Sequence, residues 1–159
     1  MTRGWARRMA AVATALLSGG CSIHGLAFER DQRVKIESPA NYATVSLPVH
    51  LYWTGHPSWR FAVFVDTSPM RPGGTLRDLA RNDPLCLRTP GCPDQRWLRD
   101  HGVYLTTGHS LTLSALQNFG NSHTKDAHQV TVTLVDASDR RIGESAWSVN
   151  LYVRRPGGS

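Results

Sequence analysis

The sequence predicts an all-β fold in which two sheets face each other, and three observations support this prediction. Apolar and polar residues alternate with a period of two along five stretches of the chain. Residues that favour turns separate these stretches. A chain of 159 residues can form one domain with its own core, and no internal repeat is visible. We expect this domain to span residues 33–154.

The first three strands are predicted at 34–36, 45–53 and 61–65, where apolar side chains occupy every second position. Side chains of a strand point to opposite faces in turn, so each stretch has one apolar face that a second sheet must cover. Trp53 continues the inward set of the second stretch, and we expect it in the core. Pro48 lacks a backbone N–H donor, so it indicates an edge position or a bulge.

The last two strands are predicted at 130–134 and 147–153 by the same alternation. Turn signals lie at 38–41, 54–57 and 136–139, where short polar side chains can bond to nearby backbone groups. Several short strands separated in this way favour a β-sandwich.

Three segments carry a resemblance to a known class of domain: Ser38-Pro39 with the stretch 45–53, the stretch 128–136, and the closing strand to Val153. Together they resemble the immunoglobulin-like or fibronectin type III-like domains of bacterial surface proteins, over about two thirds of the exported chain. The resemblance implies an immunoglobulin-like β-sandwich. No cysteine pair is placed to join the two sheets, so we do not expect an antibody-type domain.

Residues 67–104 depart from the alternating pattern, and we expect them to form a short helical insertion in the sandwich. Thr75 can cap a helix together with Asp78, three residues later. A second helical turn is predicted at 93–100, with Trp97 facing inward. Loops that a scaffold positions often carry binding function. The alternative is that the insertion only covers one end of the sandwich and hides Trp97.

Cys86 and Cys92 lie within the insertion and are separated by five residues that include Thr89-Pro90-Gly91. This tripeptide lets the chain reverse and can bring the two sulfur atoms within bonding distance, so we predict a disulfide formed in an oxidising compartment. A zinc site would need two further ligands at clustered spacing, and a thioredoxin-like pair would have two intervening residues. The short bridge would fix a local conformation more than it would stabilise the whole domain.

The first 21 residues have the composition of a secretory signal. Three arginines precede an uncharged stretch at 9–18, and two glycines join this stretch to Cys21. Positive, apolar and small residues in this order are typical of a signal peptide, so we expect residues 1–20 to be removed. About ten apolar residues are too few for a transmembrane helix, which needs roughly twenty.

The segment Leu17-Ser18-Gly19-Gly20-Cys21 resembles the lipobox of bacterial lipoproteins, although Ser18 stands where that motif ordinarily has leucine. The resemblance implies a diacylglycerol on the Cys21 sulfur, a lipidated linker at 21–32, and anchoring to the cell membrane on the side away from the cytoplasm. Two or more acyl chains such as palmitate hold a protein at a membrane, whereas one binds only marginally. The alternative is ordinary secretion, with Cys21 as an unmodified thiol.

Charge argues against nucleic acid as a partner. The chain has 18 Lys and Arg residues and 12 Asp and Glu residues, and removal of residues 1–20 would leave fifteen basic residues against twelve acidic ones. The remaining arginines are scattered, and aromatic residues are not interleaved with a basic cluster. We therefore expect no nucleic-acid binding.

The sequence contains no recognisable catalytic or metal-binding motif. Its seven histidines lack the close spacing of metal ligands, and the nearest arrangement is His123 and His128 with Asp126 between them. Nucleophile elbows, His-Glu-X-X-His helices and phosphate-binding glycine loops are absent from the sequence. We expect a non-catalytic protein without a cofactor or metal ion.

Trp59 and His56, in the turn after the second strand, are the candidate ligand contacts, because an exposed aromatic ring can bind a sugar or a partner protein. The leading hypothesis is a surface-anchored binding or envelope-scaffold module with an envelope or surface protein as its partner. The alternatives are a small-ligand or glycan-binding module and a metal-binding or hydrolytic accessory protein. We expect the tail at 155–159 to be disordered and assign it no role.

Overall fold

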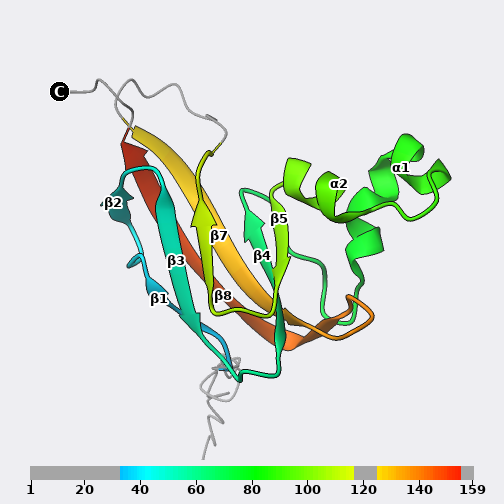
Figure 1. Ribbon diagram of the computed structural model, residues 1–159, viewed down its shortest axis with the longest axis horizontal. Helices are drawn as coiled ribbons and strands as arrows, with labels where there is room; N and C mark the ends of the chain where they lie inside the picture. Colours follow the sequence, from blue (N-terminus) through cyan, green and yellow to red (C-terminus); the bar gives the residue numbers. More distant parts are fainter. Residues whose placement is uncertain (1–32, 117–124, 155–159) are drawn as a thin grey trace, which may run out of the picture.

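The computed structural model of the protein describes residues 33–116 and 125–154, which form mainly β structure in two sheets (Figure 1). The first sheet has the order β1-β3-β6, with β1 at Lys35–Ser38, β3 at Val49–Thr54 and β6 at Ser110–Leu113. The second has the order β2-β8-β7-β4-β5, with β2 at Ala43–Val45, β8 at Arg141–Arg154, β7 at Lys125–Val135, β4 at Arg60–Val65 and β5 at Val103–Thr106. Neighbouring strands are antiparallel, except that β2 is parallel to β8. The predicted two-sheet β fold is therefore confirmed.

The alternation on β3 buries one face of that strand, as predicted. Val49, Leu51 and Trp53 are buried, and the residues between them are exposed. Trp53 is 3 % exposed, and its ring meets the edge of Phe61 from the other sheet with centroids 5.8 Å apart. The core between the two sheets thus includes Trp53, which confirms its predicted position.

The prediction of one strand at 45–53 is wrong, because the chain changes sheet within this stretch. β2 ends at Val45 and belongs to the five-stranded sheet, whereas β3 begins at Val49 and belongs to the three-stranded sheet. Pro48 lies between them and has no N–H to donate to either ladder. The strand is interrupted at the position where the sequence indicated an irregularity.

The segment between β4 and β5 forms three short helices, in agreement with the predicted insertion at 67–104. These are the 3-10 helix η2 at Leu76–Asn82, α1 at Pro84–Arg88 and α2 at Gln95–Asp100. Thr75 and Asp78 form the predicted capping box at the start of η2. Cys86 and Cys92 form the predicted disulfide, with their Cα atoms 5.2 Å apart.

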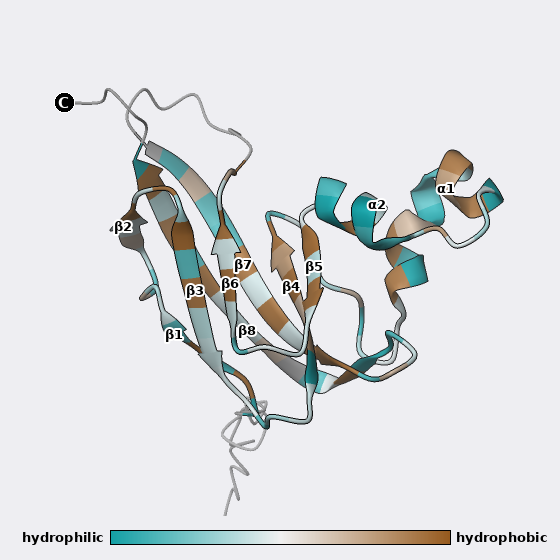
Figure 2. Ribbon diagram, viewed as in Figure 1, coloured by the Kyte–Doolittle hydropathy of each residue, from teal (hydrophilic) through white to brown (hydrophobic). Residues whose placement is uncertain are grey.

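The helical insertion covers the outer face of the five-stranded sheet. A second buried cluster joins this face to the insertion; its members are Ala62, Phe64, Met70, Leu76, Leu98, Val103 and Val135. All residues from Phe61 to Val65 are 6 % exposed or less, so β4 is buried on both faces. Figure 2 shows the hydrophobic strands β4 and β5 beside α2, which is largely hydrophilic.

Arg141 of β8 ties the insertion to the hairpin of β7 and β8. Its buried side chain donates from Nη1 to the carbonyl of Met70 (2.5 Å) and from Nη2 to the carbonyl of Glu144 (3.1 Å). Burial lowers the pKa of Arg141 from its ordinary value, because the charged guanidinium is partly desolvated. The Arg141 backbone also donates to the carbonyl of Gly74 (2.8 Å), so the chain leading into η2 is fixed to the sheet.

Several predictions concern other parts of the chain. The signal peptide at 1–20, the linker at 21–32 with Cys21, and the tail at 155–159 lie outside the described residues. Among the helices that the structure describes, none combines the length and the apolar character needed to cross a membrane.

Gly102, which joins α2 to β5, should tolerate no side chain. Its φ is +74°, and a Cβ atom would lie 2.4 Å from the carbonyl oxygen of Val65. We expect Gly102→Ala to lower the free energy of unfolding by more than the roughly 1–2 kcal/mol that a left-handed alanine costs, measured by urea denaturation. Gly91→Ala is the matched control, because Gly91 has a φ of +78° with no neighbouring atom within 4 Å. Equal losses in the two variants would contradict the predicted clash.

Candidate binding cleft

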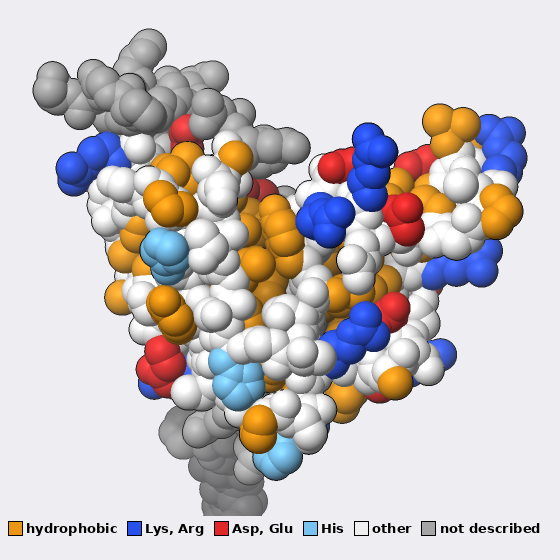
Figure 3. All heavy atoms as spheres, in the orientation of Figure 1, with side chains coloured by type: hydrophobic (Ala, Val, Ile, Leu, Met, Phe, Trp, Pro, Cys, Tyr) orange, Lys and Arg blue, Asp and Glu red, His pale blue; other side chains and the backbone are white. Residues whose placement is uncertain are grey.

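A cleft lies along the outer edge of β5, which among the described strands is paired only with β4. It consists of two adjoining cavities of about 410 and 150 Å³ that share Arg99, Val103 and Tyr104 in their linings. We call it the β5 cleft. Its half-buried apolar side chains are Leu79, Trp97, Tyr104, Leu105, Leu111 and Leu116. Figure 3 shows hydrophobic side chains in the furrow between the three-stranded sheet and the helical insertion.

Apolar side chains flank the β5 edge on both faces of the sheet. Tyr104 packs against the core between the two sheets, where Leu111 of β6 lies beside it in the smaller cavity. Leu105 packs against the second cluster under the insertion, where Leu98 of α2 lines the same cavity. Because successive side chains of a strand point to opposite faces, the edge of β5 lies between two apolar walls, and Val103 at its start is buried.

Trp97 is fixed in the wall of the larger cavity by interactions on two sides. Its ring stacks on His101 with centroids 3.7 Å apart and planes 17° apart. Its Nε1 donates to the Oδ2 of Asp83 (2.9 Å). The other carboxylate oxygen of Asp83 accepts from the backbone N–H groups of Leu85 and Cys86, both at 3.0 Å, and caps α1. These contacts hold the indole of Trp97 against the disulfide-closed helix.

The hydrogen bonds to Asp83 also change its titration. The N–H of Cys86 and then the indole N–H of Trp97 are the largest causes that lower the pKa of Asp83 below the ordinary carboxyl value. Both donors stabilise the charged form of the carboxylate, so the wall of the cleft is held most firmly when Asp83 is ionised.

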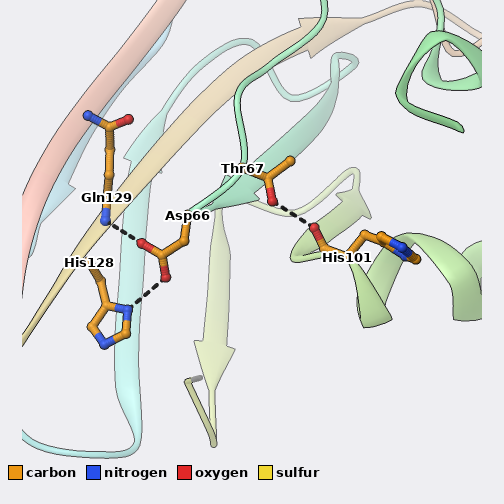
Figure 4. Close-up of polar contacts among 5 residues, drawn as sticks. All are labelled: Asp66, Thr67, His101, His128 and Gln129. Atoms are coloured by element: carbon orange, nitrogen blue, oxygen red, sulfur yellow. Dashed lines mark hydrogen bonds and ion pairs between the residues drawn. The ribbon is translucent and has the colours of Figure 1, made fainter. Parts of the chain in front are cut away.

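A polar pair adjoins the larger cavity, because Asp66 is among its lining residues. Figure 4 shows the contacts of this pair. Asp66 follows β4, and its Oδ2 lies 2.7 Å from Nδ1 of His128, whose side chain is 1 % exposed. The Oδ1 of Asp66 accepts from the backbone N–H of Gln129 (2.8 Å). Thr67 donates from its hydroxyl to the carbonyl of His101 (2.8 Å). These bonds connect the end of β4 to β7 and to the end of α2. The polar groups therefore fix the relative positions of the elements that line the cleft.

Of the two histidines whose spacing suggested a metal site, only His128 lies within the described residues. His128 is directed to Asp66, and His123, its neighbour in the only histidine pair that suggested a metal, lies outside the described residues. Within the described ranges, no group of three or more His, Cys, Asp or Glu residues could hold a metal ion.

Trp59 and His56, the ligand contacts expected from the sequence, lie together in the turn between β3 and β4, with ring centroids 5.5 Å apart. Trp59 is half-buried, and the guanidinium carbon of Arg33 is 5.9 Å from its ring centroid. Neither residue lines the β5 cleft, and their binding role stays a prediction.

The insertion at 67–104, which the sequence indicates as a candidate binding region, supplies Leu79, Trp97 and Arg99 to the larger cavity, whereas β5 and β6 were not predicted as strands. The signal that points to these two strands is a pair of short apolar segments at 103–105 and 111–113 on either side of a turn with Gly108, although β5 and β6 belong to different sheets. Each segment has only four residues in the structure.

Comparisons of the chain with known protein families, with curated proteins and with solved structures find no significant match.

Asp83→Asn should lower stability in a pH-dependent way. The pKa of Asp83 is depressed in the folded state, so its charge stabilises the fold above the ordinary carboxyl pKa of about 3.8, and this contribution disappears as the pH falls through the depressed value. We expect the variant to be less stable than the wild type at pH 7 and the difference to shrink between about pH 4 and pH 2, measured by urea denaturation.

The control for this experiment is Asp100→Asn, because the Asp100 carboxylate accepts no hydrogen bond from the described residues. A difference between wild type and Asp83→Asn that stays constant from pH 7 to pH 2 would contradict the role of the Asp83 charge.

Proposed function

We propose that this chain is a lipid-anchored, extracytoplasmic protein whose immunoglobulin-like domain binds a partner protein and catalyses no reaction. The observation that carries the proposal is the β5 cleft, an apolar cleft of two adjoining cavities along a strand edge without a second neighbour in the described sheet. Clefts lined mainly by apolar and aromatic side chains with a few fixed polar groups are typical binding sites.

The strand order supports the immunoglobulin-like part of the proposal. In immunoglobulin domains, strands A, B and E share one sheet, and strands C, F and G share the other. Here β1, β3 and β6 share one sheet, and β4, β7 and β8 are adjacent in the other. β5 lies beside β4, as the additional strand C′ lies in the sheet of strands G, F and C of variable-type domains.

The position of the cleft supports a role at a membrane surface. Arg33, the first described residue, lies near Trp59 in the turn where β4 begins. β4 then runs to the other end of its sheet, where the larger cavity opens beside Asp66 (Figure 1). A tether at Cys21 would enter the domain at the first end and would present the larger cavity away from the membrane.

The state of the polar groups supports binding over catalysis. Both carboxylate oxygens of Asp66 accept hydrogen bonds within the protein, and the Nδ1 of His101 lies 2.7 Å from the carbonyl of Trp97. A general acid or base must reach a substrate proton directly or through one water. The apolar groups of the cleft remain available for contact.

A small-ligand or glycan-binding function is the second candidate, because Trp97 and Tyr104 line the same cavity. An aromatic ring binds a sugar through its face. His101 is stacked on Trp97, however, and occupies one face of its ring. This favours a partner protein over a glycan.

Cys21→Ala should abolish lipid anchoring. Cells that express the full chain are grown with radioactive palmitate, and we expect label on the wild type and none on the variant, which should also leave the membrane fraction. The double variant Cys86→Ala/Cys92→Ala is the control, because it removes the disulfide but leaves Cys21 in place. Label that persists on Cys21→Ala would exclude this anchor.

Tyr104→Ser should weaken partner binding through the cleft. We expect the full-length wild type to retain a partner from envelope extracts. The variant should retain at least about tenfold less of this partner, because truncation of a central aromatic contact costs about 2 kcal/mol. Tyr52→Ser is the matched control, since Tyr52 is 53 % exposed on β3 and does not line the cleft. Equal retention by the two variants would place binding elsewhere.

A further inference from the structure

We infer that the outer end of the helical insertion binds a membrane surface that contains anionic phospholipids. Leu85 and Leu87 would contact the acyl region, and Arg77 and Arg88 would contact the headgroup phosphates. We call these four residues the α1 site. It is separate from the β5 cleft, and it rests on the proposed function only in so far as the exported chain lies beside a membrane.

Two leucines project from α1 at the outer end of the insertion. Leu85 is 71 % exposed, more than any other large hydrophobic residue that the structure describes, and Leu87 is 42 % exposed. Cys86 between them is buried and bonded to Cys92, so the disulfide turns this residue inward. Successive residues of a helix are about 100° apart, so both neighbours of Cys86 are directed to solvent. Figure 1 shows α1 at the end of the insertion farthest from the three-stranded sheet.

A hollow of about 500 Å³ lies beside Leu87, between the disulfide loop and the turn that joins β7 to β8. Arg77 of η2 and Arg88 of α1 line it. Within the part of the chain that the structure describes, the Arg77 side chain forms no hydrogen bond or ion pair. Arg88 donates from Nε to the carbonyl of Pro84 (3.0 Å). The hollow therefore offers guanidinium N–H groups to an external anion.

The carboxylates near the α1 site are bonded within the protein. Asp139 lines the hollow, and its Oδ1 forms an ion pair with Nη1 of Arg60 (2.5 Å). Asp78 and Asp83 accept hydrogen bonds from backbone N–H groups at the starts of η2 and α1. Their charges are thus directed to donors inside the fold. Figure 3 shows hydrophobic and basic side chains together over this end of the insertion, at the upper right.

An anionic phospholipid surface fits both parts of the α1 site. Phosphate oxygens accept paired, charge-assisted hydrogen bonds from guanidinium groups. The acyl region directly below the headgroups takes up apolar side chains, as it does for basic amphipathic helices that lie in the interface. A free phosphate ion would use the arginines and leave both leucines in water.

The shape of the site favours a lipid surface over a protein. Apolar anchors of protein interfaces fill well-packed pockets near the centre of the contact. Every residue of α1 except Cys86 is exposed, so the apolar groups lie on a convex end. A bilayer interface can deform around such an end, and the acyl chains can then surround both leucines.

Photo-crosslinking in vesicles tests the inference. The full-length chain is bound to vesicles of phosphatidylcholine alone or of equal amounts of phosphatidylcholine and phosphatidylglycerol, each with a trace of phospholipid that carries a photoreactive acyl chain. After reduction and cleavage with trypsin, we expect lipid adducts on the peptide 82–88, which contains both leucines. Adducts should be about tenfold fewer or lower still without phosphatidylglycerol, because each arginine near an anionic surface contributes about fivefold to binding.

Two charge variants separate the α1 site from the overall charge of the chain. Arg77→Gln/Arg88→Gln should lower the adducts on the peptide that contains Leu85 by about tenfold or more. Lys35→Gln/Arg154→Gln is the matched control, because it also removes two positive charges, from β1 and β8, and neither residue lines the hollow. We expect adducts at the wild-type level on the control. All four side chains are exposed, so both variants should keep the fold.

Leu85→Ser/Leu87→Ser tests the apolar part of the α1 site. We expect about tenfold fewer adducts than on the wild type, because two apolar side chains no longer enter the interface. The same variant should retain the envelope partner as the wild type does, since neither leucine lines the β5 cleft.

The inference is overturned if the peptide 82–88 carries no adduct, if adducts are equal with and without phosphatidylglycerol, or if the two charge variants give equal yields. Loss of the envelope partner by Leu85→Ser/Leu87→Ser would assign the leucines to a protein and would also overturn it. So would inorganic phosphate that protects Arg77 and Arg88 from phenylglyoxal when vesicles do not, because the hollow would then bind a free anion.

Failure of the α1 site and failure of the tether are distinguishable. If the adducts are absent while Cys21 takes up palmitate, the tether stands and the membrane contact of α1 fails. If the adducts form on a chain that takes up no palmitate, the α1 site is supported and the tether is excluded.

Discussion

The structure depends on the need to cover β4 on both faces. Five consecutive apolar residues from Phe61 to Val65 leave this strand no polar face, and burying a side chain of this size contributes roughly 1.5–3 kcal/mol. One face packs against the three-stranded sheet, and the other requires a cover that the sandwich does not supply. The helical insertion provides that cover. Because it emerges from the end of β4 and returns as β5, its position also determines the wall of the β5 cleft.

A few polar interactions and a disulfide make the insertion rigid enough to form one wall of the β5 cleft. Asp83 caps α1 and holds the indole of Trp97, and the disulfide closes the loop beyond α1. Arg141 binds the chain that leads into η2 through the Met70 carbonyl. Each contact is modest by itself, since a typical hydrogen bond contributes about 1 kcal/mol net. Together they connect the cleft to the hairpin of β7 and β8, so the cleft is formed before any ligand binds.

The sequence predicted the parts of the fold that repeat a local pattern. Alternation identified β1, β3, β7 and β8, Thr75 with Asp78 identified the start of η2, and the cysteine spacing identified the disulfide. The run at 61–65 was interpreted as one-sided alternation, although its unbroken apolar character indicates burial on both faces. The cleft was not predictable in the same way. β5 and β6 are too short for a periodic signal, and the contact of Asp66 with His128 joins residues 62 positions apart.

The placement of Arg33 and the larger cavity at opposite ends of β4 has a mechanical consequence. A pull between a membrane tether and a partner held in the cleft would act along the strands, because β4 runs from the end near Arg33 to the end at Asp66. Hydrogen bonds between strands lie perpendicular to that direction, so they would be loaded in shear and would share the tension instead of opening one after another. β1, paired with β3, would carry the load first. A domain held at these two points would therefore resist the pull through many hydrogen bonds at once.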